Sequence, residues 1–127
     1  MKFIIAKRVD AFLCNNFPRY KLWRICNAIG ITPHPWQRDF ALGKSNNFGT
    51  HAYHRATGKT MAVMLRILMR PDVEVRTYMF ESDPDWIPYD KPRVRWYLGE
   101  YRKLANMCIQ SGIRVPVISS YYRMTMR

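Results

Sequence analysis

The sequence predicts an α/β domain with three layers, in which helices cover a small parallel sheet and further helices precede it. From residue 48 onward the apolar pattern reads strand, helix, strand, helix, strand, and this alternation is typical of a parallel sheet. The chain has 127 residues, 48% of them apolar, which suits one domain with one core. We therefore expect a single domain over 1–127, with a helical segment over 1–30 and the α/β part over 31–127.

Two helices are predicted in the N-terminal segment. Apolar residues recur at helical spacing from Phe3 to Phe17, and Pro18 can end this helix or begin the next one. The second helix runs to Ile29, with Gly30 at a position where helices commonly end. We interpret the pair as amphipathic helices that close a small domain.

The α/β part begins with two prolines that hold the chain extended. The remaining elements are predicted from periodicity, turn residues and helix-ending residues. In chain order they are a short helix from Trp36 to Leu42 that ends at Gly43, a strand over Phe48–His54, a buried helix over Thr60–Arg70, a strand over Val73–Phe80, a loop over Glu81–Lys91, a helix over Pro92–Ser111 closed by Gly112, and a strand over Ile113–Ser119.

The charge of the chain is strongly positive. There are 21 Lys and Arg against 9 Asp and Glu, a net charge of +12. The basic residues are spread along the chain without long runs, which favours a folded positive surface over a disordered tail. Such a surface suits a polyanionic partner, above all nucleic acid.

Cysteine usage and hydropathy indicate the compartment. Cys14, Cys26 and Cys108 are an odd number without CxxC spacing, so we expect small buried hydrophobes in a reducing environment. No secretory signal and no apolar run of membrane-spanning length is present in the sequence. The expectation is a soluble cytoplasmic protein with no membrane partner.

The segment Arg55-Ala56-Thr57-Gly58-Lys59-Thr60 carries the second half of the phosphate-loop pattern G-x-x-x-x-G-K-[ST]. In that pattern backbone N–H groups and a helix N-terminus surround phosphates, Lys meets the outer phosphates, and the hydroxyl binds Mg²⁺. The first glycine is replaced here by Tyr53. The alternative is that Gly58-Lys59-Thr60 only starts a helix, with Thr57 as its N-cap.

These residues resemble the P-loop NTPases of the helicase and phage terminase large-subunit branch, in their N-terminal ATPase part. Terminase loops often carry an Arg and lack the leading glycine, which is similar to the segment that begins at Arg55. Pro33-His34-Pro35-Trp36-Gln37 is similar to the Pro-Thr-Pro-x-Gln segment of DEAD-box helicases, and Gln37 precedes Gly58 by 21 residues. The resemblance covers Ile31 to Phe80.

The resemblance implies ATP and Mg²⁺ as cofactors. It implies that Lys59 holds the phosphates within the loop around Thr57 and Gly58, and that Thr60 holds Mg²⁺. Gln37 would read the adenine, and Arg55 would meet a phosphate or a partner. For Gln37 the alternative is a solvated polar residue on a short helix. A phage origin would fit a chain of this kind, which would place it in the host cytoplasm.

Hydrolysis in these families needs a strand that ends in an Asp-Glu pair, and this sequence contains no such pair. Glu81 follows a predicted strand and is a weak catalytic candidate. We therefore expect slow hydrolysis or none by the isolated chain. The acids of the following loop could be imagined as a metal site, but their spacing lacks the EF-hand pattern and favours a solvated loop.

Basic and aromatic residues alternate near the C-terminus, a combination that suits single-stranded nucleic acid. The candidate contacts are Arg93, Arg95, Arg102, Lys103 and Arg123. Alternatively, Trp96, Tyr97 and Leu104 form the core face of a helix whose cations are solvated.

The sequence thus favours an ATP-binding protein that acts on nucleic acid. One rival is a non-enzymatic nucleic-acid-binding adaptor or inhibitor built on a degenerate motor scaffold. Another is a domain completed by a protein partner that supplies the missing acid and an arginine finger.

Overall fold

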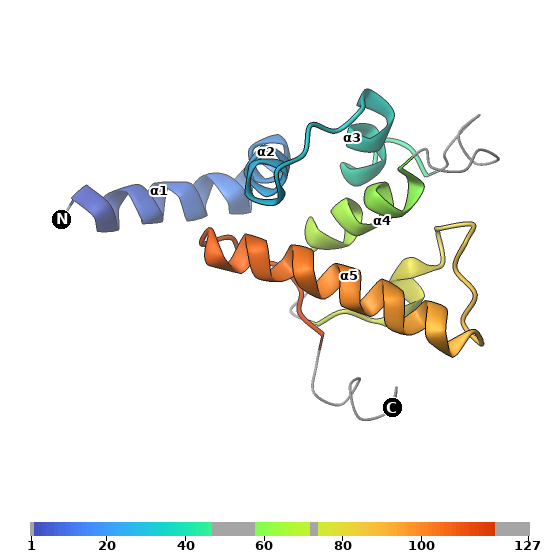
Figure 1. The fold of residues 1–127 in the computed structure, drawn as a ribbon. Coiled ribbons are helices and arrows are strands. Elements are labelled where there is room, and N and C mark those ends of the chain that lie inside the picture. Colours follow the sequence, from blue (N-terminus) through green and yellow to red (C-terminus); the bar gives the residue numbers. More distant parts are fainter. Residues whose placement is uncertain (1, 47–57, 72–73, 119–127) are drawn as a thin grey trace.

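The computed structural model describes residues 2–46, 58–71 and 74–118, and over these residues the protein is mostly helical (Figure 1). The elements are α1 (Lys2–Asn16), α2 (Pro18–Ile29), α3 (Pro35–Ala41), α4 (Lys59–Leu68), the 3-10 helix η2 (Thr77–Phe80) and α5 (Lys91–Gln110). The five predicted α-helices in the described part are therefore confirmed to within a few residues.

The predicted three-layer parallel sheet is wrong. In the described ranges the extended segments meet in a single parallel bridge, between Glu74 and Val117, with the Val75 N–H donating to the Val117 carbonyl at 2.9 Å. The expected strand over Val73–Phe80 instead turns into η2, and the one over Ile113–Ser119 makes only this bridge. The expected strand over Phe48–His54 lies outside the described residues.

Proline and an aromatic side chain limit the pairing at Val117. Pro116 has no N–H to donate to a ladder, and its carbonyl accepts a hydrogen bond from the Tyr101 hydroxyl of α5. The segment before Val117 is therefore tied to a helix instead of to a second strand.

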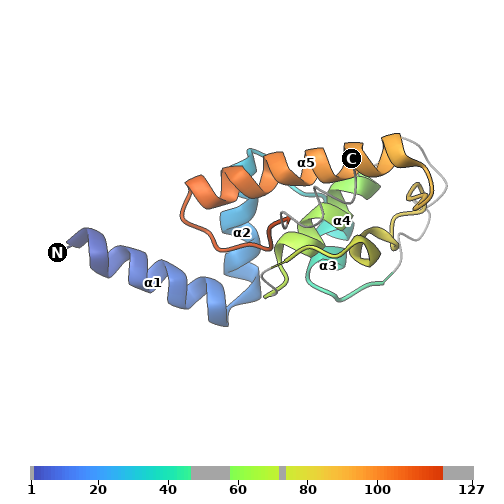
Figure 2. The ribbon, with the colours of Figure 1, turned by 90° about the horizontal axis from the view of Figure 1, so that it is seen from below.

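The core centres on α4, which lies between α3 and α5 (Figures 1 and 2). This helix is apolar on most of its sides, as its sequence predicts, and its buried members come from nearly every turn: Ala62, Val63, Met64, Leu65, Ile67 and Leu68. Gly30 ends α2 in the left-handed region, at φ 76°. The predicted glycine stop of that helix is confirmed.

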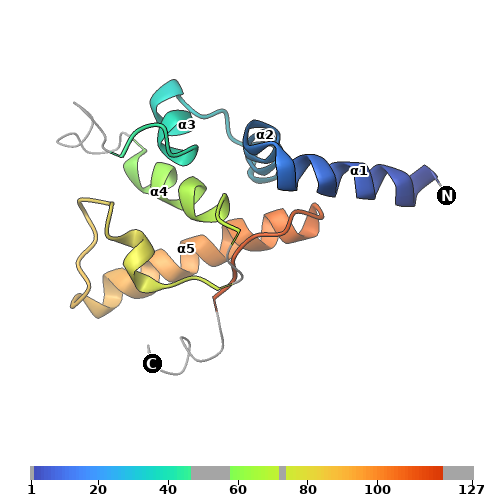
Figure 3. The same cartoon turned by 180° about the vertical axis from the view of Figure 1, so that it is seen from behind.

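The helix α1 projects from the rest of the protein in every view (Figures 1, 2 and 3). Val9 and Phe12 are 51% and 60% exposed, so α1 closes the domain less than its apolar spacing predicts. It is held to α2 by Asp10, whose carboxylate accepts from Arg24 at 2.8 Å and from Tyr20. The hydrogen bond from Arg24 is the main cause that lowers the pKa of Asp10. Arg24 also donates to the Ser111 carbonyl at 2.8 Å, just after α5.

Cys26 and Cys108 are buried and Cys14 is half-buried, all as free thiols. Burial raises the pKa of Cys108 to about 11, so this thiol stays protonated and packs as a small hydrophobe. Among the described helices, none combines the length and apolar character that a membrane span requires.

Candidate functional site

The phosphate-loop residues lie at the start of α4. Gly58 is the N-cap of this helix, with φ 84°, a left-handed conformation that favours glycine. A Cβ at this position would collide with the amide nitrogen of Gln37. The N-cap is thus Gly58, and not Thr57 as the helix-start alternative supposed. Thr57 and Arg55 lie outside the described residues.

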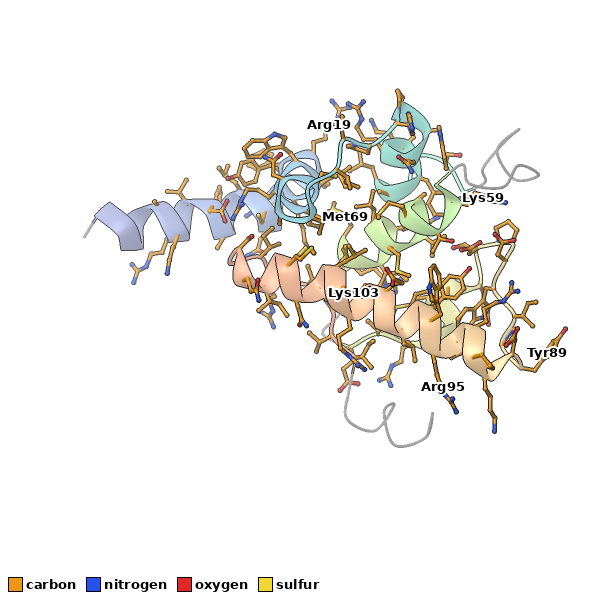
Figure 4. All side chains as sticks on the ribbon, viewed as in Figure 1. Arg19, Lys59, Met69, Tyr89, Arg95 and Lys103 are labelled. Atoms are coloured by element: carbon orange, nitrogen blue, oxygen red, sulfur yellow. The ribbon has the colours of Figure 1, made fainter. Side chains whose placement is uncertain are left out.

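The start of α4 has the features of an anion site. Gly58 has no side chain to cap the helix, and the first turn contains no acidic residue. The first N–H groups of a helix lack partners within it, and they carry partial positive charge. The Lys59 side chain is only 7% exposed at this end of the helix, where Figure 4 labels it. Its Nζ is 4.0 Å from Oδ2 of Asp85, a carboxylate that is 60% exposed.

A buried carboxylate, Asp83, lies against Thr60. Asp83 is 2% exposed, and its Oδ2 accepts from the Thr60 hydroxyl at 2.8 Å and from the Tyr97 hydroxyl at 2.7 Å. Its Oδ1 accepts from the backbone N–H of Asp85 at 2.9 Å. Burial and the hydrogen bond to Asp83 raise the pKa of Tyr97, so Tyr97 stays a hydrogen-bond donor. One side chain therefore joins α4, the loop after η2 and α5.

A cavity of about 680 Å³ opens beside Thr60. It lies between the start of α4, the loop after η2 and the first turns of α5, and its lining residues are Thr60, Asp85, Asp90, Pro92, Arg93, Trp96 and Tyr97. This volume is in the range of small-molecule sites. The cavity therefore places space for a ligand next to the predicted Mg²⁺ ligand.

The described residues contain no group of three His, Cys, Asp or Glu side chains that could hold a metal ion by themselves. Mg²⁺ does not need such a group, because it commonly binds one or two carboxylates together with substrate phosphates and water. Thr60, Asp85 and Asp90 line the cavity and offer one hydroxyl and two carboxylates of this type, whereas the buried Asp83 already accepts three hydrogen bonds, one of them from Thr60. The donor set fits Mg²⁺ that arrives with a phosphate ligand.

Asp83 was missed by sequence reasoning, which treated the loop acids together as solvated. That interpretation is wrong for Asp83 and correct for the exposed Glu81. The available signal was the apolar surroundings of Asp83, since Phe80 and Trp86 are buried on either side of it. Glu81 follows η2 instead of a strand, and it does not line the cavity beside Thr60. Its catalytic role stays a prediction.

Gln37 is buried and hydrogen-bonded to the protein backbone. It is 6% exposed, its Oε1 accepts from the His34 backbone N–H at 2.8 Å, and its Nε2 donates to the Gly58 carbonyl at 3.0 Å. The alternative of a solvated polar residue is therefore wrong. Both ends of the amide have protein partners, so reading adenine would require Gln37 to exchange them.

Replacement of Gln37 tests this structural role. We expect Gln37→Ala to lower the free energy of unfolding by about 2 kcal/mol, because it empties a buried site and removes the hydrogen bonds to the His34 N–H and the Gly58 carbonyl. Urea unfolding measures the loss, with Gln110→Ala at the exposed end of α5 as the control. An unchanged midpoint would contradict it. The ratio of ATP to GTP affinity in the same variant tests the adenine role separately.

The candidate nucleic-acid residues on α5 do not form one free basic face. Arg93 donates to the Asp85 carbonyl at 2.7 Å and lies 3.5 Å from Asp90, while Lys103 pairs with Glu100 at 3.0 Å. Arg95 is exposed, and Figure 4 labels it with Lys103 along α5; Arg102 is partly buried. Arg123 lies outside the described residues.

Some aromatic residues of α5 belong to the core, and others are exposed as a nucleic-acid contact would require. Tyr97 is buried and belongs to the core, as the core-face alternative supposed, and Leu104 is partly buried. Trp96 is 54% exposed and lines the cavity beside Thr60. Trp96 is thus the aromatic residue of this helix that is available to a ligand there.

Comparison of the chain with protein-family models, with curated proteins and with solved structures gave no match.

Proposed function

We propose that the protein binds a nucleoside triphosphate with Mg²⁺ at the start of α4. The observation that carries the proposal is the 2.8 Å hydrogen bond from the Thr60 hydroxyl to the buried Asp83 carboxylate, next to the shielded Lys59. A hydroxyl held by a buried carboxylate suits Mg²⁺ that binds together with phosphate, and Thr60 and the nearby Asp85 would hold the ion. The phosphates would meet Lys59 and the backbone N–H groups of the first turn.

The charges around the site explain why the proposed ligand includes Mg²⁺. Asp83, Asp85 and Asp90 bring three carboxylates to a region with two nearby cations, Lys59 and Arg93. A bare triphosphate would be repelled by this surplus of negative charge, whereas a Mg²⁺ complex would not. We therefore expect binding to depend on Mg²⁺, and we take ATP as the first ligand to test.

Nucleic acid is the proposed macromolecular partner, and the support for it is the net charge of +12. A cytoplasmic location follows from this choice of ligand and partner. An exposed Glu81 away from the cavity supports slow turnover by the isolated chain.

A thermal shift measurement tests nucleotide binding. A ligand that binds only the folded state stabilises it by mass action, so ATP with Mg²⁺ at about 100 times its Kd should raise Tm by roughly 10 °C. Lys59→Ala should abolish the shift, and Thr60→Val should weaken it together with its Mg²⁺ dependence. The matched control is Lys103→Ala, a 69% exposed lysine on α5.

The same measurements can also contradict the proposed nucleotide site. A melting curve that does not move at millimolar ATP, or a full shift in Lys59→Ala, would remove the proposed site. Phosphate release should remain near background in the parent protein. Brisk release that Glu81→Gln abolishes would show that the chain is a complete ATPase.

A further inference from the structure

A second cavity lies on a face of the protein that the nucleotide site does not use. It has a volume of about 560 Å³ and is enclosed by α2, the extended segment after it, α3 and the turn that follows α3. Leu22, Cys26, Ile31 and Leu42 supply its apolar surface, and Pro33 and Pro35 lie in its wall. Both prolines restrict the backbone, so this wall is preformed.

Three cations from separate elements line this cavity. Arg19 comes from α2, Arg38 from α3 and Lys44 from the turn after α3. Figure 4 shows Arg19 reaching from α2 into the space beside α3. All three side chains are exposed, and the ion pairs between described residues include none of them. One acid, Asp39, lines the same cavity, so its surroundings are net positive.

An exposed aromatic ring lies among these cations. Trp23 of α2 lines the cavity and is 57% exposed, although tryptophan is usually well covered. Tyr20 supports it, with ring centroids 5.7 Å apart. A supported indole leaves one face available for another planar group to stack on.

We infer that this cavity binds single-stranded nucleic acid, with a base stacked on Trp23 and the flanking phosphates on Arg19, Arg38 and Lys44. Aromatic stacking beside a basic groove is the combination by which proteins hold single strands. A duplex cannot use Trp23 in this way, because its bases are stacked and paired internally. An acidic peptide would satisfy the cations but leave the indole and the apolar surface without a partner.

The inference rests on the proposed binding of nucleic acid and assigns the place where it occurs. It differs from the expectation based on sequence, which put the contacts on α5 and at Arg123. There Arg93 and Lys103 already pair with acids of the same helix region, whereas the cations of the second cavity do not. The two surfaces each carry one exposed tryptophan, so they can be compared directly.

Fluorescence anisotropy with a labelled oligothymidylate of about 12 nucleotides tests the site in the full chain. Trp23→Ala should weaken binding about tenfold or more, while Trp23→Phe should keep most of the affinity. Arg38→Ala should lower the slope of log affinity against log salt by about 0.7. Lys103→Ala is the matched control on α5 and should leave binding unchanged, while Trp96→Ala tests whether the α5 surface takes part. Melting curves establish that each variant is folded.

Other results overturn the inference in distinguishable ways. Normal binding by Trp23→Ala, with binding lost in Trp96→Ala, would place the strand on α5 and leave the proposed partner intact. Equal affinity for a duplex of the same sequence, or equal competition by polyglutamate, would remove the single strand as the ligand of this cavity. No binding of the oligonucleotide at low salt would remove the nucleic-acid partner itself, while the ATP measurement would still stand.

Discussion

Replacement of Asp83 by alanine is expected to lower the free energy of unfolding by about 3 kcal/mol or more. The side chain is 2% exposed and accepts three hydrogen bonds, and bonds to a carboxylate are stronger than those between neutral groups. Its removal would leave the buried Tyr97 hydroxyl and the backbone N–H of Asp85 without this acceptor. A loss of this size is a large part of the 5–15 kcal/mol typical of a folded domain.

The loop supplies its own control for this experiment. Asp85 is two residues away and 60% exposed, so Asp85→Ala should change stability by less than about 0.5 kcal/mol. Chemical unfolding of both variants without nucleotide measures the difference. Equal effects would mean that Asp83 does not hold the loop to α4 and α5. In that case Tyr97→Phe and Thr60→Val should also be nearly neutral.

Phe80→Ala is expected to have the largest effect of any change in the described part of the loop and η2, about 4 kcal/mol. Phe80 is fully buried, and three rings surround it: Trp86 at 5.1 Å, Tyr97 at 5.6 Å and Tyr101 at 6.4 Å between centroids. Truncation would leave a cavity lined by rigid rings, which relax little to fill it. Near-ultraviolet circular dichroism should weaken as the aromatic packing loosens.

Tyr78 provides the matched control, since it lies on the same turn and is 56% exposed. Tyr78→Ala removes a ring of similar size from solvent and should cost well under 1 kcal/mol. Phe80→Leu should fall between the two, because leucine fills part of the volume. If the two alanine variants unfold at the same denaturant concentration, Phe80 is not the centre of this cluster.

The helices could be predicted because local residues decide them. The apolar spacing along α4 and α5 and the glycines after α2 and α5 act within a few positions, so one sequence is enough to place them. The exposure of α1 could not be predicted, because apolar spacing does not say whether a partner covers the apolar face.

The sheet was predicted wrongly because pairing depends on distant residues. The alternation through Val75 is compatible with a strand, but the chain turns into η2 at Thr77, where the Met79 N–H donates to the Arg76 carbonyl at 3.0 Å instead of to a neighbouring strand. Pro116 was the available warning, since it cannot donate to a ladder.

Only part of the candidate site could be predicted from the sequence. Gly58-Lys59-Thr60 is a local pattern, and the structure confirms that a helix starts there. Asp83 is 23 residues from Thr60, and their meeting depends on how the loop folds around Phe80 and Trp86. Acidic residues in a loop predict solvent exposure on average, and only the burial of their neighbours reverses that expectation.

The position of Arg24 also sets an order of assembly. Its bond to Asp10 joins residues 14 apart, whereas its bond to the Ser111 carbonyl joins residues 87 apart. The loop that the first bond closes is short and its closure is fast, while the second needs the chain up to residue 111 to have left the ribosome. The Thr60 and Tyr97 bonds to Asp83 span 23 and 14 residues. The α1–α2 pair can therefore form before α5 is complete, and it docks later through the buried Leu22 and Ile25 of α2 together with Arg24.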